Sequence, residues 1–197
     1  QEASMALGDV SEVAKTAKAG GKEALKMVDF KIFRPVKLML AQTVSDVYEA
    51  LLMHGGKSAF EYKYDGARVQ IHKRDNEVRV FSRRLTDVTN SLPEIIETVR
   101  KNVKASEAIL EGEVVAVDNS GIPIPFQHLM RRFRRVHRVN NMVKKIPVRL
   151  YLFDIIYHEG KRLVASPYST RRMILGENSG DIPLTNLLVV CDDLALP

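Results

Sequence analysis

The chain has 197 residues, of which 45% are apolar and 27% are charged. This length allows one full-sized domain, or one domain and part of a second, with a hydrophobic core of its own. The composition excludes a disordered chain. Because no apolar run approaches the ~18 to 20 residues of a membrane span and no secretory signal opens the sequence, we expect a cytoplasmic protein without a membrane partner.

Cysteine and histidine usage limits the kinds of site that the chain can hold. Cys191 is the single cysteine, which rules out an internal disulfide and fits a reducing compartment. The five histidines are scattered and lack the close Cys/His pairing of a zinc site. Any metal is therefore expected to be a hard cation held by carboxylates and phosphates.

The charge balance points to a polyanionic partner. The net charge is +6, which weakly favours a nucleic acid. The first 30 residues are nearly balanced in charge, so the basic excess belongs to the rest of the chain.

The N-terminal part of the chain favours helix and then extended structure. Helix is predicted over residues 9–19 and 22–28, with Gly20-Gly21 as a break between them. The segment FKIFRPVKLMLAQ (30–42) places Pro35 among β-branched and aromatic residues. That pattern predicts an extended entry into a new domain.

A short helix and a region of period-two alternation follow. The helix is predicted to start with Thr43 or Ser45 as the N-cap and to end at Gly55-Gly56. Alternation then predicts strands over residues 58–65, 67–73 and 77–84, with a polar turn at 74–76 that forms an antiparallel hairpin.

The second half of the chain alternates irregularly between helices and strands. The expected elements are a helix at 92–103, a strand at 108–118, an amphipathic helix at 126–139, a strand at 148–160, a helix from 167 to about 176 and a strand at 187–190. Short strands with hairpin connections favour an α+β fold with mainly antiparallel sheets flanked by helices.

Lys63 lies in an unusually charged stretch, EYKYDGARVQ, at the end of the first predicted strand. In a strand, Glu61, Lys63 and Asp65 would share one face, and a surface ion-pair ladder of small energetic value is one explanation. The other is that Lys63 is a nucleophile, whose amine must be kept uncharged by its surroundings. The positive charges of Arg68 and Arg83 could help to keep the amine uncharged, and the two arginines could also hold a polyphosphate.

The residues around Lys63 resemble a known signature. Asp65-Gly66 is expected to form a tight turn that lets the backbone approach a ligand closely. The run EYKYDGAR resembles the K-x-D-G nucleotidyltransferase signature of ATP-dependent DNA ligases of the archaeal and eukaryotic replicative type. Further similar stretches arrive in the family's order, namely FRPVKLMLAQ before the lysine and then FSRR with DVT, EGE, PFQHLMRRFRR and LFDIIY. The resemblance covers essentially the whole chain.

The resemblance implies a covalent mechanism. Lys63 would attack the α-phosphate of ATP, release pyrophosphate and carry AMP, which would pass to the 5′-phosphate of nicked double-stranded DNA before a 3′-hydroxyl displaces it. The implied binding roles are adenine recognition by Glu61, base stacking by Phe153, ribose or phosphate contacts by Arg68 and Arg83, and a ribose or Mg²⁺ (or Mn²⁺) contact by Glu113. Glu113 would share a strand face with Glu111.

The predicted helix at 126–139 carries arginines around an apolar stripe. The candidates for contact with the DNA backbone are Arg131, Arg132, Arg134 and Arg135, which would position a duplex without reading its sequence. A solvated helix face is the alternative.

The resemblance also predicts the domain organisation. Residues 1–30 are similar to the last helices, with linker, of an N-terminal DNA-binding domain, and residues 31–197 to an adenylation domain without its later glutamate-bearing and lysine-bearing strands. The sequence therefore predicts an incomplete ligase that adenylates itself poorly and cannot seal nicks alone. The alternatives are an RNA ligase, an mRNA-capping nucleotidyltransferase, or a catalytically inactive DNA-binding fragment. A sliding clamp is a candidate protein partner.

Overall fold

The computed structural model describes residues 3, 10–26, 28–37, 41–133, 143 and 145–191, and the side chains of all of these except residues 26, 133 and 188–191. The chain divides into two compact units. The first consists of Gln1–Leu38 and Asp65–Leu184, and the second of Met39–Tyr64 and Thr185–Pro197. The domain boundary expected at residue 30 stays a prediction.

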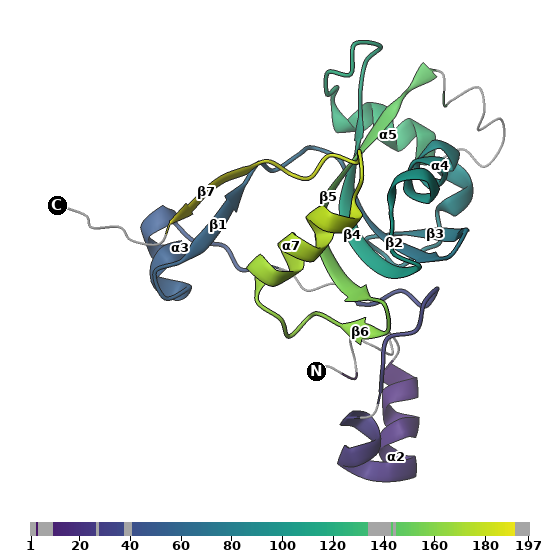
Figure 1. The fold of residues 1–197 in the computed structure, drawn as a ribbon, viewed down its shortest axis with the longest axis vertical. Helices are drawn as coiled ribbons and strands as arrows, with labels where there is room; N and C mark the ends of the chain where they lie inside the picture. The colour runs from purple at the N-terminus through teal and green to yellow at the C-terminus, as the bar shows by residue number, and fades with distance from the viewer. Residues whose placement is uncertain are drawn as a thin grey trace. The chain divides into compact units, whose positions relative to one another are not determined.

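A five-stranded antiparallel sheet forms the centre of the first unit (Figure 1). The strand order is β3-β2-β4-β5-β6, and the strands are β2 (Ala67–Arg74), β3 (Glu77–Ser82), β4 (Glu107–Ala116), β5 (Val148–His158) and β6 (Lys161–Arg162). Asp75 adopts a positive φ of 51° in the turn between β2 and β3, where the hairpin was expected. The α+β fold with an antiparallel sheet is confirmed.

Helices build the main hydrophobic core against this sheet. They are α4 (Pro93–Asn102), α5 (Phe126–Phe133) and α7 (Tyr168–Asn178), which contact β3, β4 and β5 respectively (Figure 1). Alternate residues of β2 and β4, such as Val69, Ile71 and Leu110, point into this core. Their near-complete burial fixes which face of the sheet is left for polar side chains.

A segment that precedes the sheet covers part of the sheet's polar face. Phe30, Ile32 and Val36 are buried and form a second, smaller cluster with Ile109 of β4 and Ile156 of β5. Of the extended entry predicted for residues 30–42, the stretch 30–36 is therefore packed on the sheet.

The second unit holds one helix and a two-stranded sheet. The helix α3 (Val47–Met53) is capped by Asp46, whose carboxylate accepts from the Glu49 backbone N–H at 2.8 Å. The predicted N-caps, Thr43 and Ser45, are wrong by one or more residues. Asp46 is the cap because its carboxylate accepts from the Glu49 N–H three residues on, whereas the Ser45 hydroxyl donates to the Glu49 carboxylate instead.

The strand predicted over residues 58–65 is too long. β1 (Ser58–Glu61) pairs with β7 (Leu187–Cys191), and the register shifts between Phe60 and Glu61. The strand ends at Glu61, opposite Leu187, where its antiparallel partner β7 begins, and the first unit resumes at Asp65.

Other boundaries follow the sequence prediction closely. The helix α2 (Val10–Lys26) is interrupted at Gly20 and Gly21, and Gly21 has a φ of 60°. A short 3₁₀ helix, η1 (Thr89–Ser91), and the two-residue β6 were not predicted. The predicted continuation of α5 over residues 134–139 lies outside the described residues. None of the described helices combines the length and apolar character that a bilayer crossing needs.

Candidate functional site

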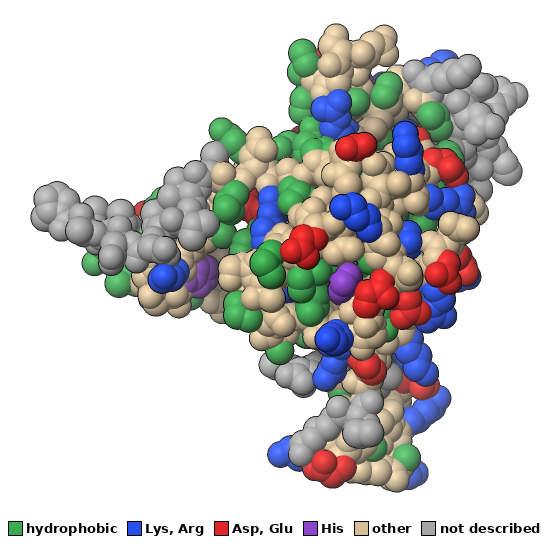
Figure 2. All heavy atoms as spheres, in the orientation of Figure 1, with side chains coloured by type: hydrophobic (Ala, Val, Ile, Leu, Met, Phe, Trp, Pro, Cys, Tyr) green, Lys and Arg blue, Asp and Glu red, His purple; other side chains and the backbone are tan. Residues whose placement is uncertain are grey.

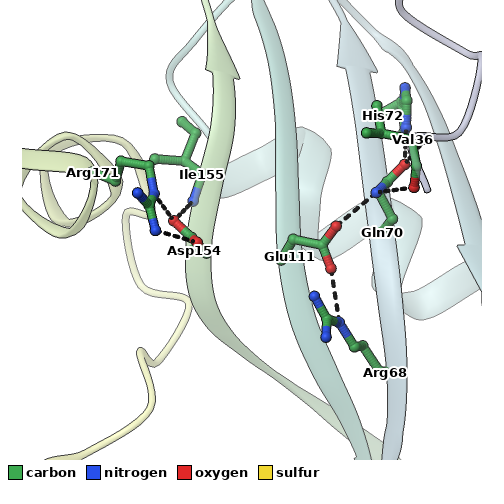
Figure 3. Close-up of polar contacts among 8 residues, drawn as sticks. All are labelled: Val36, Arg68, Gln70, His72, Glu111, Asp154, Ile155 and Arg171. Atoms are coloured by element: carbon green, nitrogen blue, oxygen red, sulfur yellow. Dashed lines mark hydrogen bonds and ion pairs between the residues drawn. The ribbon is translucent and has the colours of Figure 1, made fainter. Parts of the chain in front are cut away.

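Three neighbouring strands bring predicted site residues together on the polar face of the sheet. Arg68 of β2 donates from Nε to Oε2 of Glu111 on β4 at 3.1 Å (Figure 3). The Arg68 guanidinium also lies over the ring of Phe153 on β5, 5.3 Å from its centroid. The arrangement joins a cation, a carboxylate and an aromatic face.

Glu113 lies on the same face as Glu111, as the sequence predicted. The register pairs Arg68 with Glu113 and Gln70 with Glu111, so alternate residues of the two strands meet. Gly112 stands between the two glutamates because a Cβ there would lie 2.7 Å from the Tyr151 carbonyl oxygen. The close approach of β4 to β5 therefore explains the glycine in EGE.

The Glu111 carboxylate is buried among donors. It is 2% exposed, whereas the Arg68 side chain is 33% exposed. Burial raises the pKa of Glu111 above its ordinary value, and the Arg68 charge and the Gln70 hydrogen bond oppose that rise. The Arg68 guanidinium is therefore bonded to a buried carboxylate, while part of the side chain stays accessible to solvent.

Lys63 and Glu61 belong to the second unit, whereas Arg68, Glu113 and Phe153 belong to the first. The Lys63 side chain is exposed, and Glu61 accepts from the Thr185 hydroxyl at 2.6 Å. Because β1 ends at Glu61, the alternation of Glu61, Lys63 and Asp65 along one strand is wrong.

The Asp-Gly pair that follows Lys63 anchors the chain to the first unit. Asp65 accepts from the backbone N–H of Phe126 at 3.4 Å, which places a carboxylate at the N-terminus of α5. A Cβ at Gly66 would lie 2.9 Å from Cγ of Glu113 and would also clash with the Val114 carbonyl oxygen. The Gly66 backbone thus lies close to β4, while the approach to a ligand expected at this glycine stays a prediction.

Arg83 lies in an exposed turn after β3. Ser82 pairs with Val69, so the turn begins at the Arg68 end of the β2–β3 hairpin. Leu85 has a φ of 62° in this turn. Arg83 is therefore available for an anion, although its role stays a prediction.

The structure describes two of the four arginines proposed to contact DNA. Arg131 is exposed, whereas Arg134 and Arg135 lie outside the described residues. Arg132 is 1% exposed, so the prediction of a DNA contact is wrong for this residue. Its guanidinium donates to the carbonyl oxygens of Ser91 at 3.1 Å and Ile146 at 3.0 Å and pairs with Glu94. On the face shown in Figure 2, basic and acidic side chains are interspersed.

Sequence reasoning missed several polar residues beside the site. Gln70 and His72 follow Arg68 at alternate positions of β2 and are buried. Asp154, next to Phe153, pairs with both Nε and Nη2 of Arg171 on α7, at 2.7 and 2.9 Å (Figure 3). The alternation of ARVQIH indicates that one face of the strand is polar. It gives no sign that residues 28–37 cover that face.

The described carboxylates could hold a metal ion only together with the phosphates of a bound nucleotide. No group of three His, Cys, Asp or Glu side chains among the described residues is arranged to hold a metal ion. Mg²⁺ commonly takes one or two protein carboxylates together with substrate phosphates. Glu113, which is half-buried, could supply one such carboxylate.

A protein-family model matches most of the chain. Residues 38–187 match the family model described as the ATP dependent DNA ligase domain. The chain belongs to the ATP-dependent DNA ligase family. The match covers the K-x-D-G stretch, both glutamates and Phe153, so the family resemblance is confirmed.

Archaeal DNA ligases are among the relatives. The chain is 48% identical over 177 residues to a DNA ligase of Thermococcus fumicolans, covering 90% of this chain and 32% of the relative. It is 51% identical over 167 residues to a DNA ligase of Methanothrix thermoacetophila, covering 85% and 29%. The chain thus spans about a third of the length of the curated relatives it matches.

Solved ligase structures share the fold. The ligase domain of LigD from M. tuberculosis is similar with a TM-score of 0.51 and 26% identity, covering 68% of this chain and 41% of that chain. Mycobacterial DNA ligase D complexed with ATP and MES has a TM-score of 0.51 and 27% identity, covering 68% and 42%. The chain is accordingly an adenylation domain of the ligase family, in partial form relative to full ligases.

Proposed function

We propose that this chain carries the nucleotide site and the adenylate-accepting lysine of an ATP-dependent DNA ligase. The observation that carries the proposal is the junction of Arg68, Glu111 and Phe153 on the polar face of the sheet, within a chain of the ligase family. The related mycobacterial ligase complexed with ATP supports the choice of nucleotide.

The proposed chemistry is nucleotidyl transfer to an amine. The Nζ lone pair of Lys63 attacks the α-phosphorus of ATP, the bond to the bridging oxygen breaks, and pyrophosphate leaves with that electron pair. The amine loses its protons and the product is a lysyl-AMP phosphoramidate. AMP then passes to the 5′-phosphate of a nick, and the 3′-hydroxyl displaces it.

The binding roles follow the chemistry of each side chain. Phe153 offers a ring face for adenine, and Glu61 offers carboxylate oxygens to its amino group. Arg68 and Arg83 supply guanidinium groups for the ribose or the phosphates. Mg²⁺ or Mn²⁺, held by Glu113 and the phosphates, would neutralise phosphate charge.

Nicked double-stranded DNA is the proposed substrate of the longer protein. Arg131 on α5, with Arg134 and Arg135, is proposed to contact phosphates, which would make DNA binding fall with increasing salt. Arg132 is left out because it is buried. A sliding clamp as partner and a cytoplasmic location remain proposals of the same kind.

Calorimetric titration of the chain with ATP and with GTP, in the presence of Mg²⁺, tests the nucleotide assignment. We expect ATP to bind in preference to GTP, and Phe153→Ala to weaken ATP binding by about tenfold because base stacking on an aromatic ring contributes roughly 1 to 3 kcal/mol. Tyr48→Ala removes an exposed aromatic ring of α3 and is the matched control. Preference for GTP would indicate a capping-type enzyme, and binding of neither nucleotide would contradict the proposal.

A further inference from the structure

Gln70 stands between the segment 28–37 and the candidate nucleotide site. Its side chain is 1% exposed and lies on β2 between Arg68 and His72, on the polar face of the sheet (Figure 3). Nothing in the proposed chemistry uses this residue. A buried amide must nevertheless find partners for two donors and two acceptor positions.

All of these hydrogen-bonding positions are used, and they face in two directions. Toward the segment, Gln70 Oε1 accepts from the Val36 backbone N–H at 2.6 Å, and Nε2 donates to the Val36 carbonyl oxygen at 3.1 Å. Toward the site, Nε2 donates to Oε1 of Glu111 at 2.6 Å. Because an ionised carboxylate can only accept, this contact fixes which end of the amide faces Glu111.

His72 adds a second tie to the same segment. Its Nδ1 accepts from the Phe33 backbone N–H at 3.0 Å, and its Nε2 lies 2.8 Å from Oε1 of Gln70, to which it donates in the matching tautomer. Phe33 has a φ of 69°, in the left-handed region that disfavours a bulky side chain. The Arg79 guanidinium lies 4.7 Å from the Phe33 ring centroid. Several contacts thus hold the segment in one position.

The Glu111 carboxylate transmits the position of Gln70 to Arg68. One of its oxygens accepts from Gln70 and the other from Nε of Arg68 at 3.1 Å. Since Glu111 is 2% exposed, water cannot readily replace a lost donor. Loss of the Gln70 hydrogen bond would therefore turn the carboxylate toward its remaining donor, Arg68, and move the guanidinium away from its position over Phe153.

We propose that Gln70 is a positioning residue, which couples the seating of residues 28–37 on the sheet to the orientation of the Arg68 guanidinium toward the nucleotide. The inference rests on the proposed function for the identity of the ligand. The hydrogen-bonded chain itself, from Phe33 and Val36 through His72, Gln70 and Glu111 to Arg68, does not depend on it. Gln70 touches no reacting atom and acts through Glu111.

The test compares Gln70→Met with Lys73→Met in the full chain. Lys73 is a buried polar residue of the same strand, but it donates to the Ala105 carbonyl oxygen at 2.5 Å, away from the site. ATP and adenosine are titrated against both variants. We expect Gln70→Met to weaken ATP binding about five- to tenfold and adenosine binding much less, because the lost orientation belongs to a phosphate-binding cation. Lys73→Met should lower stability and leave both affinities unchanged.

A double-mutant cycle distinguishes positioning from a general structural effect. In an Arg68→Met background, Gln70→Met should cause no further loss of ATP affinity, because Arg68 is already absent. The proposal would be overturned if Gln70→Met lowered ATP affinity by the same factor in the wild-type and Arg68→Met backgrounds. It would also be overturned if Gln70→Met bound ATP as tightly as wild type does. If Gln70→Met does not fold, Gln70→Asn retains the amide but is too short to reach both Val36 and Glu111, and the same results are expected of it.

A readout without nucleotide separates the failure of this proposal from a failure of the proposed function. The Nε–H resonance of Arg68 in ¹⁵N NMR spectra reports its bond to Glu111. We expect that resonance to shift or broaden in Gln70→Met and to stay in place in Lys73→Met. If the wild-type chain binds no ATP while the resonance behaves this way, the nucleotide assignment fails and the coupling stands. An unchanged resonance in Gln70→Met contradicts the coupling.

Discussion

His72 is a buried side chain that the fold needs in its neutral form. Burial lowers its pKa to about 3 from the ordinary 6.5, and the neutral ring both accepts from Phe33 and donates to Gln70. Between these two pH values the unfolded chain binds one more proton at this site than the folded chain does. Stability from His72 is therefore fully present above pH 6.5 and is lost by about 1.4 kcal/mol for each pH unit below it.

Urea unfolding of wild type and His72→Gln at neutral pH and at pH 5 checks this expectation. The advantage of wild type over the variant should shrink by about 2 kcal/mol between the two conditions. Glu111, whose raised pKa gives the opposite slope from about pH 4.5 upward, is present in both proteins, so its effect cancels in the difference. A wild-type advantage that does not change with pH would show that His72 is not held neutral.

Single residues are also where sequence reasoning succeeded and failed most clearly. The ordered motifs named Arg68 and Phe153, and the structure brings their side chains together, while their roles and that of Glu113 stay predictions. Arg132 was misjudged because its neighbours, Ser91 and Ile146, are distant in the sequence, and only the folded chain shows that they accept its hydrogen bonds. Gln70 was missed for the same reason.

Among the elements, α5 packs on β4 and is also joined to α4 by an ion pair whose arginine is buried. Arg132 of α5 pairs with Glu94 in the first turn of α4. Removing one partner of a buried pair leaves an uncompensated charge, so Glu94→Gln should destabilise the chain by about 3 kcal/mol. The control is Glu97→Gln on the same helix, which breaks an exposed pair with Arg100 and should cost less than about 1 kcal/mol. Equal midpoints of urea unfolding for the two variants would refute this role.

The periodicity of the sequence predicted the type of most elements and missed some of their ends. α4, β4 and β5 were placed within a few residues because each has a long, regular pattern that matches one buried face. The end of β1 was missed because it depends on where its antiparallel partner β7 begins, and that pairing is between residues far apart in the chain. β6 has only two residues and leaves no periodic signal.

At the scale of the whole molecule, the predicted site residues are divided between the two compact units. Lys63 and Glu61 belong to the second unit, and Arg68, Glu113 and Phe153 belong to the first. The relatives are about three times longer than the aligned part of this chain, so sealing of nicks is a proposal for the longer protein. Adenylation of Lys63 is the step of the proposed reaction that can be tested with this chain alone.

The most direct test is to incubate the chain with Mg²⁺ and ATP that carries a label on either the α- or the γ-phosphate. We predict covalent retention of the α-label alone, on the peptide that contains Lys63, and no labelling of Lys63→Ala. Because the Lys63 side chain is exposed in this structure, labelling should be slow and incomplete. Lys101→Ala, which removes an exposed lysine of α4, should label as wild type does. Retention of the γ-label, an α-label on another residue, or no label after prolonged incubation would contradict the account.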